Sequence, residues 1–235
     1  MMTFSLKRVS AIVRKEYMDL MKNYQITIML AVPPVYAAIF LHLGAEGAEI
    51  ARTCIMMALL MVGMFIQANM ISEEKEKDTL RGLMLSPASV GDVLAGKSFI
   101  TFILTAAVCT FCLALANISM NISLMVLVIC IGILLFISMG TLIGLIAQSV
   151  SALNTIIVPV MFFLMFGSMF AEGVDNEMIR TILMNLPTTH IMKSVTSVIE
   201  GKAISELTTP LLVMTGWFLC LVVASVIVYR KKNMD

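Results

Sequence analysis

The chain has 235 residues, of which 60% are hydrophobic and only 13% are charged. Soluble domains carry about 25% charged residues, so this composition excludes a soluble protein and indicates a membrane protein. The formal net charge of +1 also excludes a nucleic-acid-binding protein, because binding to a phosphate backbone requires a clustered basic excess.

The N-terminal segment, residues 4–24, places apolar side chains at helical spacing opposite a face of lysines and arginines. This pattern predicts an amphipathic helix that lies in the membrane interface, with Lys15 and Lys22 at the lipid headgroups. The alternative is a solvated amphipathic helix that packs on a partner protein.

Several stretches are long and apolar enough to cross a membrane, which takes roughly 20 residues per helix. The run from Ser98 to Ala171 contains no charged residue and no histidine, and polar breaks at residues 117–123 and 148–154 divide it into three segments. We therefore predict an all-α integral membrane protein with one transmembrane domain, residues 1–235. Its six spans are expected at residues 26–43, 53–71, 98–116, 124–147, 154–171 and 210–229.

Prolines and glycines within these spans predict where helices bend or pack closely. Pro33 and Pro34 remove backbone hydrogen bonds and are expected to kink or break the first span, and Pro159 lies inside the fifth. Gly140 and Gly144 form a G-x-x-x-G pattern in the fourth span, which allows another helix to approach closely. We favour packing within one subunit over dimerisation for this pattern.

The segment from residue 172 to residue 208 is too polar to span a membrane and too apolar for a simple loop. Its periodicity predicts two short amphipathic helices in the outer leaflet, which form a lid or a re-entrant hairpin. The last span is then expected to start with Thr209 as its cap and Pro210 at the first helical position.

The basic residues predict the orientation, because cytoplasmic segments carry an excess of lysine and arginine. With both termini in the cytoplasm, the outer segments hold only Arg52, Arg180, Lys193 and Lys202. The inner segments hold the other twelve of the 16: Lys7, Arg8, Arg14, Lys15, Lys22, Lys75, Lys77, Arg81, Lys97, Arg230, Lys231 and Lys232.

Residues 91–98, GDVLAGKS, match the spacing of a phosphate-binding loop. Such a loop follows a buried strand and leads into a helix whose N-terminus faces the phosphates. Here a short helix is expected from Ser86 and Pro87 to about Gly96, and a membrane span follows directly. We therefore expect no nucleotide site, and we expect Lys97 to extend to the headgroups.

The preceding segment, residues 72–97, is the most charged part of the chain. Leu80, Leu83 and Met84 form one apolar face of a possible helix, and acidic and basic residues form the rest. Such a helix can dock in a groove of another protein, whereas the alternative is a solvated loop between two spans. The residues of this segment are compatible with both the docking helix and the solvated loop.

This segment resembles the cytoplasmic signature of the permeases of the second exporter type of ATP-binding-cassette (ABC) transporters. The signature reads E-x-E-x-x-T-L, then S-P, then G-K, and it falls on Glu74, Glu76, Thr79, Leu80, Leu83, Ser86, Pro87, Gly96 and Lys97. Residues 13–23, 166–170 and 186–201 are similar to the interfacial helix, the end of the fifth span and the outer helix of the same family. Asp78 and Arg81 differ from the family, in which glycine and an acidic residue are common.

The resemblance implies a transporter subunit without enzymatic activity, whose cytoplasmic coupling helix between the second and third spans is moved by a partner. The implied partners are two separately encoded ATPase subunits, which hold ATP and magnesium, a second permease copy or paralogue, and membrane lipid. The implied location is the bacterial cytoplasmic membrane, and this chain itself is expected to hold no cofactor or metal. The coupling residues are then expected to be Glu73, Glu74, Glu76, Asp78, Thr79, Leu80, Arg81, Leu83, Ser86 and Pro87.

Two other classes of function compete with export. An intramembrane enzyme needs paired catalytic groups at membrane depth, and no such set occurs within the predicted spans. A scaffold or sensor that binds a regulator through residues 72–97 stays open as the alternative. The uncharged spans and the 22 methionines favour a hydrophobic or amphipathic cargo, such as a peptide, drug or lipid, although core filling explains most of the methionines.

Overall fold

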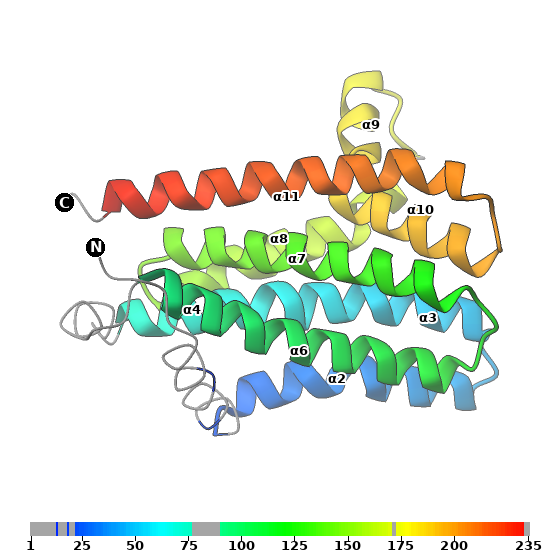
Figure 1. Ribbon diagram of the computed structural model, residues 1–235, viewed down its shortest axis with the longest axis horizontal. Coiled ribbons are helices and arrows are strands. Elements are labelled where there is room, and N and C mark those ends of the chain that lie inside the picture. Colours follow the sequence, from blue (N-terminus) through cyan, green and yellow to red (C-terminus); the bar gives the residue numbers. More distant parts are fainter. Residues whose placement is uncertain (1–12, 14–17, 19–21, 77–89, 171–172, 233–235) are drawn as a thin grey trace.

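The computed structural model describes residues 13, 18, 22–76, 90–170 and 173–232. All regular elements in this part of the chain are helices (Figure 1). Six of them are long and apolar enough to cross a membrane, which confirms the predicted all-α membrane architecture. These spans are Tyr24–His42, Gly47–Glu76, Leu94–Ala116, Ile122–Ile146, Val150–Gly167 and Ile204–Lys231.

The long helices run side by side, and two short helices, α9 and α10, lie toward the end of the bundle where α11 begins (Figure 1). We call the opposite end, which carries Glu74, Lys97 and Arg230, the charged end. The elements are α2 (Tyr24–His42), α3 (Gly47–Met57), η1 (Ala58–Ile66), α4 (Gln67–Glu76), α6 (Val90–Ala116), α7 (Ile122–Ile146), α8 (Val150–Phe170), α9 (Glu177–Met184), α10 (Pro187–Ile199) and α11 (Ile204–Lys232).

The second span is the centre of the bundle and consists of α3, η1 and α4 without interruption. Leu59, Val62 and Met64 are completely buried, because other helices pack around this span on every side. A helix that is apolar over its whole circumference belongs in such a central position. Its middle segment, η1, is a π-helix, a wider form of helix that is common near functional sites.

The fourth span, α7, packs closely on this central helix through glycines. A Cβ atom added to Gly140 would overlap the backbone carbonyl oxygen of Met64, and one added to Gly144 would lie 2.7 Å from the Ala68 carbonyl oxygen. The G-x-x-x-G pattern therefore brings together two helices of one subunit, as we expected. Glycine is required here because the obstacle is backbone, which cannot rotate away.

The prolines do not break their helices. Helix α2 is continuous through Pro33 and Pro34, and α8 is continuous through Pro159. In α2, Pro33 is buried, and its carbonyl oxygen accepts a hydrogen bond from the Cys54 thiol at 3.5 Å. Packing against the second span holds α2 in a helical conformation.

The predicted start of the last span is wrong, because α11 begins at Ile204 and Pro210 lies inside the helix. Leu207 is buried in the core, and this contact favours extension of the helix past the proline. The missing N–H of Pro210 leaves the carbonyl of Glu206 without its intrahelical donor, and Glu206 is exposed at the helix end.

The two short helices between the last two spans are present, whereas their depth in the membrane stays a prediction. The side chain of Asn176 caps α9 by accepting hydrogen bonds from the backbone N–H groups of Met178 and Ile179. Helix α10 starts at Pro187, and the indole N–H of Trp217 donates to the Asn185 carbonyl at 3.1 Å. The hydrogen bond from Trp217 attaches the turn between α9 and α10 to α11, against which α10 also packs.

The predicted interfacial helix, residues 4–24, lies largely outside the described residues, and so does Lys15. Lys22 is described and exposed, immediately before the Asn23 cap of α2.

Candidate functional site

The described part of the predicted coupling segment is the end of α4, where Glu73, Glu74 and Glu76 lie. The other expected coupling residues, Asp78, Thr79, Leu80, Arg81, Leu83, Ser86 and Pro87, lie outside the described residues.

Glu74 forms a buried ion pair with Lys97 of α6. The Glu74 carboxylate lies 3.3 Å from the Lys97 ammonium, and the two residues are only 6% and 1% exposed. The ammonium also donates a hydrogen bond to the Met70 carbonyl at 3.2 Å. A charged group that is removed from water needs this kind of partner, and the pair joins the second span to the third.

This geometry corrects two expectations. Lys97 does not extend to the headgroups, because α6 already begins at Val90 and Lys97 lies within the helix on the side that faces α4. Glu74 is directed into the bundle and is not a surface residue. Glu74 and Lys97 therefore balance each other's charge inside the subunit.

Lys75 binds the end of α7. Its ammonium donates hydrogen bonds to the carbonyl oxygen of Leu145, at 2.9 Å, and to that of Ala147. The last carbonyls of a helix have no intrahelical donor, and the helix dipole places partial negative charge there. A lysine is therefore well suited to this position.

Glu76 binds the start of α8. Its carboxylate accepts a hydrogen bond from the backbone N–H of Val150 at 2.8 Å. The N-terminus of a helix carries partial positive charge, which favours a carboxylate. Each of three consecutive α4 residues thus contacts a different helix, and we call Glu74, Lys75, Glu76 and Lys97 together the charged junction.

A second polar layer lies one to two turns deeper and is centred on Gln67, which is fully buried. Its amide nitrogen donates to the hydroxyls of Ser98 and Thr141, at 3.2 and 3.1 Å. Its amide oxygen accepts from the Thr101 hydroxyl at 2.7 Å. Our sequence analysis missed this layer, although a glutamine within an apolar span was a usable signal for interhelical hydrogen bonding.

A polar cavity of about 260 Å³ lies beside the charged junction, between α2, α4 and α8. Glu73 and Glu76 line it, together with Asn69, whose side chain is almost fully buried. Two of the expected coupling residues, Glu73 and Glu76, therefore face this cavity.

Residues 91–98 do not form a phosphate-binding loop, because all of them lie within the continuous helix α6. The backbone N–H groups of a helix interior are directed along the helix axis and cannot converge on a phosphate. The short helix expected to end near Gly96 is also wrong, since α6 continues through this residue to Ala116.

An apolar cavity of about 270 Å³ lies in the membrane-spanning part, between α2, the second span and α8. Every described residue that lines it is apolar, and the rings of Phe162 and Phe166 pack with their centroids 4.8 Å apart. Its other lining residues are Met29, Met57, Leu60, Met61, Phe65, Val158, Met161 and Met165.

Comparison with known proteins gives one family. The family model described as "ABC-2 family transporter protein" matches residues 46–227, which is more than half of the chain and includes all four residues of the charged junction. No curated protein matches the chain in a sequence comparison.

Proposed function

The chain belongs to the ABC-2 transporter family and is the membrane permease of an ABC transporter; from this premise we propose that it exports a hydrophobic or amphipathic substrate. In this proposal two separate ATPase subunits bind and hydrolyse ATP with magnesium, and a second permease copy or paralogue completes the transporter. The membrane is the bacterial cytoplasmic membrane, and the charged end, with both chain termini, faces the cytoplasm.

The charged junction is the observation that carries this proposal. Helix α4 leads directly into residues 77–89, the segment expected to contact the ATPase. A displacement of α4 would act at once on α6, α7 and α8, because Glu74, Lys75 and Glu76 bind one of these helices each. Such coupling requires that the ATPase dimer binds two positions of α4 with different affinities.

The apolar cavity supports the choice of cargo. Five methionines and three phenylalanines line it, and flexible methionine side chains adapt to ligands of varied shape. A free sugar or an ion would lose its hydration there without gaining hydrogen bonds. A peptide, drug or lipid with a hydrophobic part would gain contacts.

Replacing Lys75 by Met is expected to reduce stimulation of the ATPase by about tenfold while the subunits still associate. The variant loses charge-assisted hydrogen bonds of about 1.5–3 kcal/mol between α4 and the end of α7. The measurement is ATP turnover in proteoliposomes, using the ATPase subunits that co-purify with the chain from host membranes.

Two control variants make this result specific. Lys75→Arg keeps the charge and should retain most of the stimulation, and Lys231→Met removes a lysine from the exposed end of α11 and should behave like the unmodified protein. Full stimulation by Lys75→Met would contradict the proposed role of the charged junction. A scaffold, the alternative function, would not stimulate ATP turnover in any of these forms.

Replacing Met161 by Trp is expected to reduce substrate-stimulated ATP turnover by roughly tenfold, because the indole is larger than the methionine side chain and fills the apolar cavity. A tenfold effect corresponds to about 1.4 kcal/mol of lost substrate binding. The probes are ethidium, a hydrophobic peptide and a fluorescent phospholipid, with glucose as the negative control. Phe163→Trp is the matched variant, since Phe163 lies on the same helix and is exposed outside the cavity. Equal stimulation in both variants would argue against this cavity as the substrate path.

A further inference from the structure

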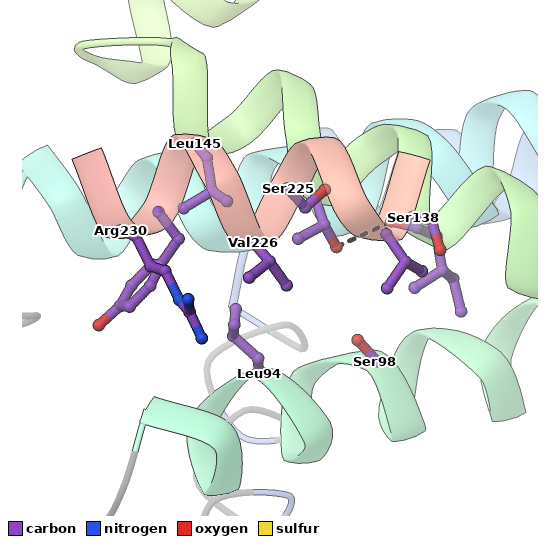
Figure 2. Close-up of a pocket in the computed structure, with 11 residues that line it drawn as sticks. Leu94, Ser98, Ser138, Leu145, Ser225, Val226 and Arg230 are labelled. Carbon is purple, nitrogen blue, oxygen red and sulfur yellow. Dashed lines mark hydrogen bonds between the residues drawn. The ribbon is translucent and has the colours of Figure 1, made fainter. Parts of the chain in front are cut away.

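A groove of about 340 Å³ opens between α6 and α11 at the charged end (Figure 2). Helix α7 packs against both helices and forms the floor of the groove, where Ser138 and Thr141 lie. In Figure 2, Val226 and Arg230 of α11 project toward Leu94 of α6 across the groove. The groove adjoins the charged junction through Leu145, which lines the groove and whose backbone carbonyl accepts from Lys75.

Three of the hydroxyl groups that line the groove already have hydrogen-bond acceptors within their own helices. Ser138 donates to the Leu134 carbonyl, Thr141 to the Ile137 carbonyl and Ser225 to the Leu221 carbonyl, each at 2.8 Å. These three hydroxyls therefore have no need of water or of a polar ligand as an acceptor. The groove offers a predominantly apolar surface along its length, which suits a hydrocarbon chain.

The mouth of the groove is positively charged. Arg230 is exposed there, and it forms no ion pair within the part of the chain that the structure describes. A planar guanidinium binds a phosphate group with two parallel hydrogen bonds. Arg230 ends the apolar part of α11, so that it lies where the lipid phosphates of the adjacent leaflet are expected.

The walls of the groove belong to the surface that contacts lipid. Phe99 of α6 and the α11 residues Val223 and Ile227 are large, apolar and exposed beside it. In a bilayer such a groove is filled by acyl chains, and the charge at its mouth selects among the lipids that supply them.

We propose that this groove is a binding site for one anionic phospholipid, with an acyl chain between α6 and α11 and the phosphate on Arg230. The proposal depends on the membrane location of the chain and not on its export activity. Binding can be measured without ATP, so that its failure and the failure of the proposed function are distinct results.

The test uses tryptophan fluorescence, because the chain has a single tryptophan, Trp217. In a Trp217→Phe background, Val226→Trp introduces an indole into the groove and Val223→Trp introduces one on the neighbouring lipid-facing surface. Each variant is reconstituted into phosphatidylcholine vesicles in which brominated phosphatidylglycerol or brominated phosphatidylcholine serves as the quencher.

We expect the Val226→Trp indole to report a relative binding constant about fivefold higher for phosphatidylglycerol, the contribution of one basic residue near a membrane surface. The Val223→Trp indole should report equal constants. Addition of Arg230→Gln should remove the preference, whereas Lys231→Gln should keep it.

Three outcomes would overturn the proposal: equal quenching by both lipids, loss of the preference in Lys231→Gln, or an indole shielded from all lipid because a second copy or another protein covers the groove. If the tryptophan variants do not fold, native mass spectrometry of the otherwise unmodified protein decides. One tightly held anionic lipid that is lost in Arg230→Gln supports the site, and its absence from the unmodified protein refutes it.

Discussion

Replacing Lys97 by Met should lower the free energy of unfolding by about 3–5 kcal/mol, the cost of breaking a buried ion pair. The substitution removes the ammonium that lies 3.3 Å from the Glu74 carboxylate, and both residues are almost completely buried. The measurement is reversible unfolding in bicelles.

The double variant Glu74→Gln with Lys97→Met should recover most of this loss, because no buried charge then lacks its partner. Lys202→Met provides the matched control. Lys202 pairs with Glu200 at 2.8 Å, a shorter distance, but both side chains are about half exposed. We expect no change in stability there, because solvent screens the pair. A Lys97→Met protein as stable as the unmodified one, or a double variant no better than the single, would contradict the structural role of this pair.

The second large effect is expected at Gly140, where replacement by alanine should cost about 3 kcal/mol of stability. The added methyl group would overlap the Met64 carbonyl oxygen of η1 and force α7 away from the second span. The measurement is again unfolding in bicelles, together with the yield of folded protein.

Gly216→Ala is the matched control, because no atom lies within 4 Å of a Cβ added at this position of α11. Alanine has a higher helix propensity than glycine, so that this variant should be as stable as the unmodified protein or slightly more stable. The stability of Gly144→Ala should lie between the stabilities of Gly140→Ala and Gly216→Ala, since its Cβ would lie 2.7 Å from the Ala68 carbonyl oxygen. Equal stability of all three variants would show that α7 can shift freely, contrary to its close packing on the second span.

The sequence by itself determined the class of protein and the number of spans. A bilayer excludes charged groups and unpaired backbone, so that the uncharged run from Ser98 to Ala171 could only form several membrane helices. The spacing of Gly140 and Gly144 also predicted a close helix contact, because small residues at this interval mark one face of a helix. The resemblance that begins at Glu74 pointed to the family.

Only the tertiary structure decided how each helix is rotated about its axis and what each polar side chain contacts. Lys97 at the entrance of a span could have extended to the headgroups, and Lys75 could have remained in solvent. Their actual partners, Glu74 and the end of α7, come from elements that are distant in the chain or face each other only after folding. The groove at Arg230 likewise arises between α6 and α11, which are far apart in the sequence.

The sequence leaves the rotation and the neighbours of each helix undetermined because of the solvent that surrounds a membrane protein. In water, an alternation of apolar and polar residues tells which face of a helix is buried, but in a membrane both the protein-facing and the lipid-facing surfaces are apolar. The spans of this chain are apolar all round, so that composition fixes their number and leaves their rotation and neighbours to packing. The few polar residues within them, such as Gln67, find their partners only when that packing is complete.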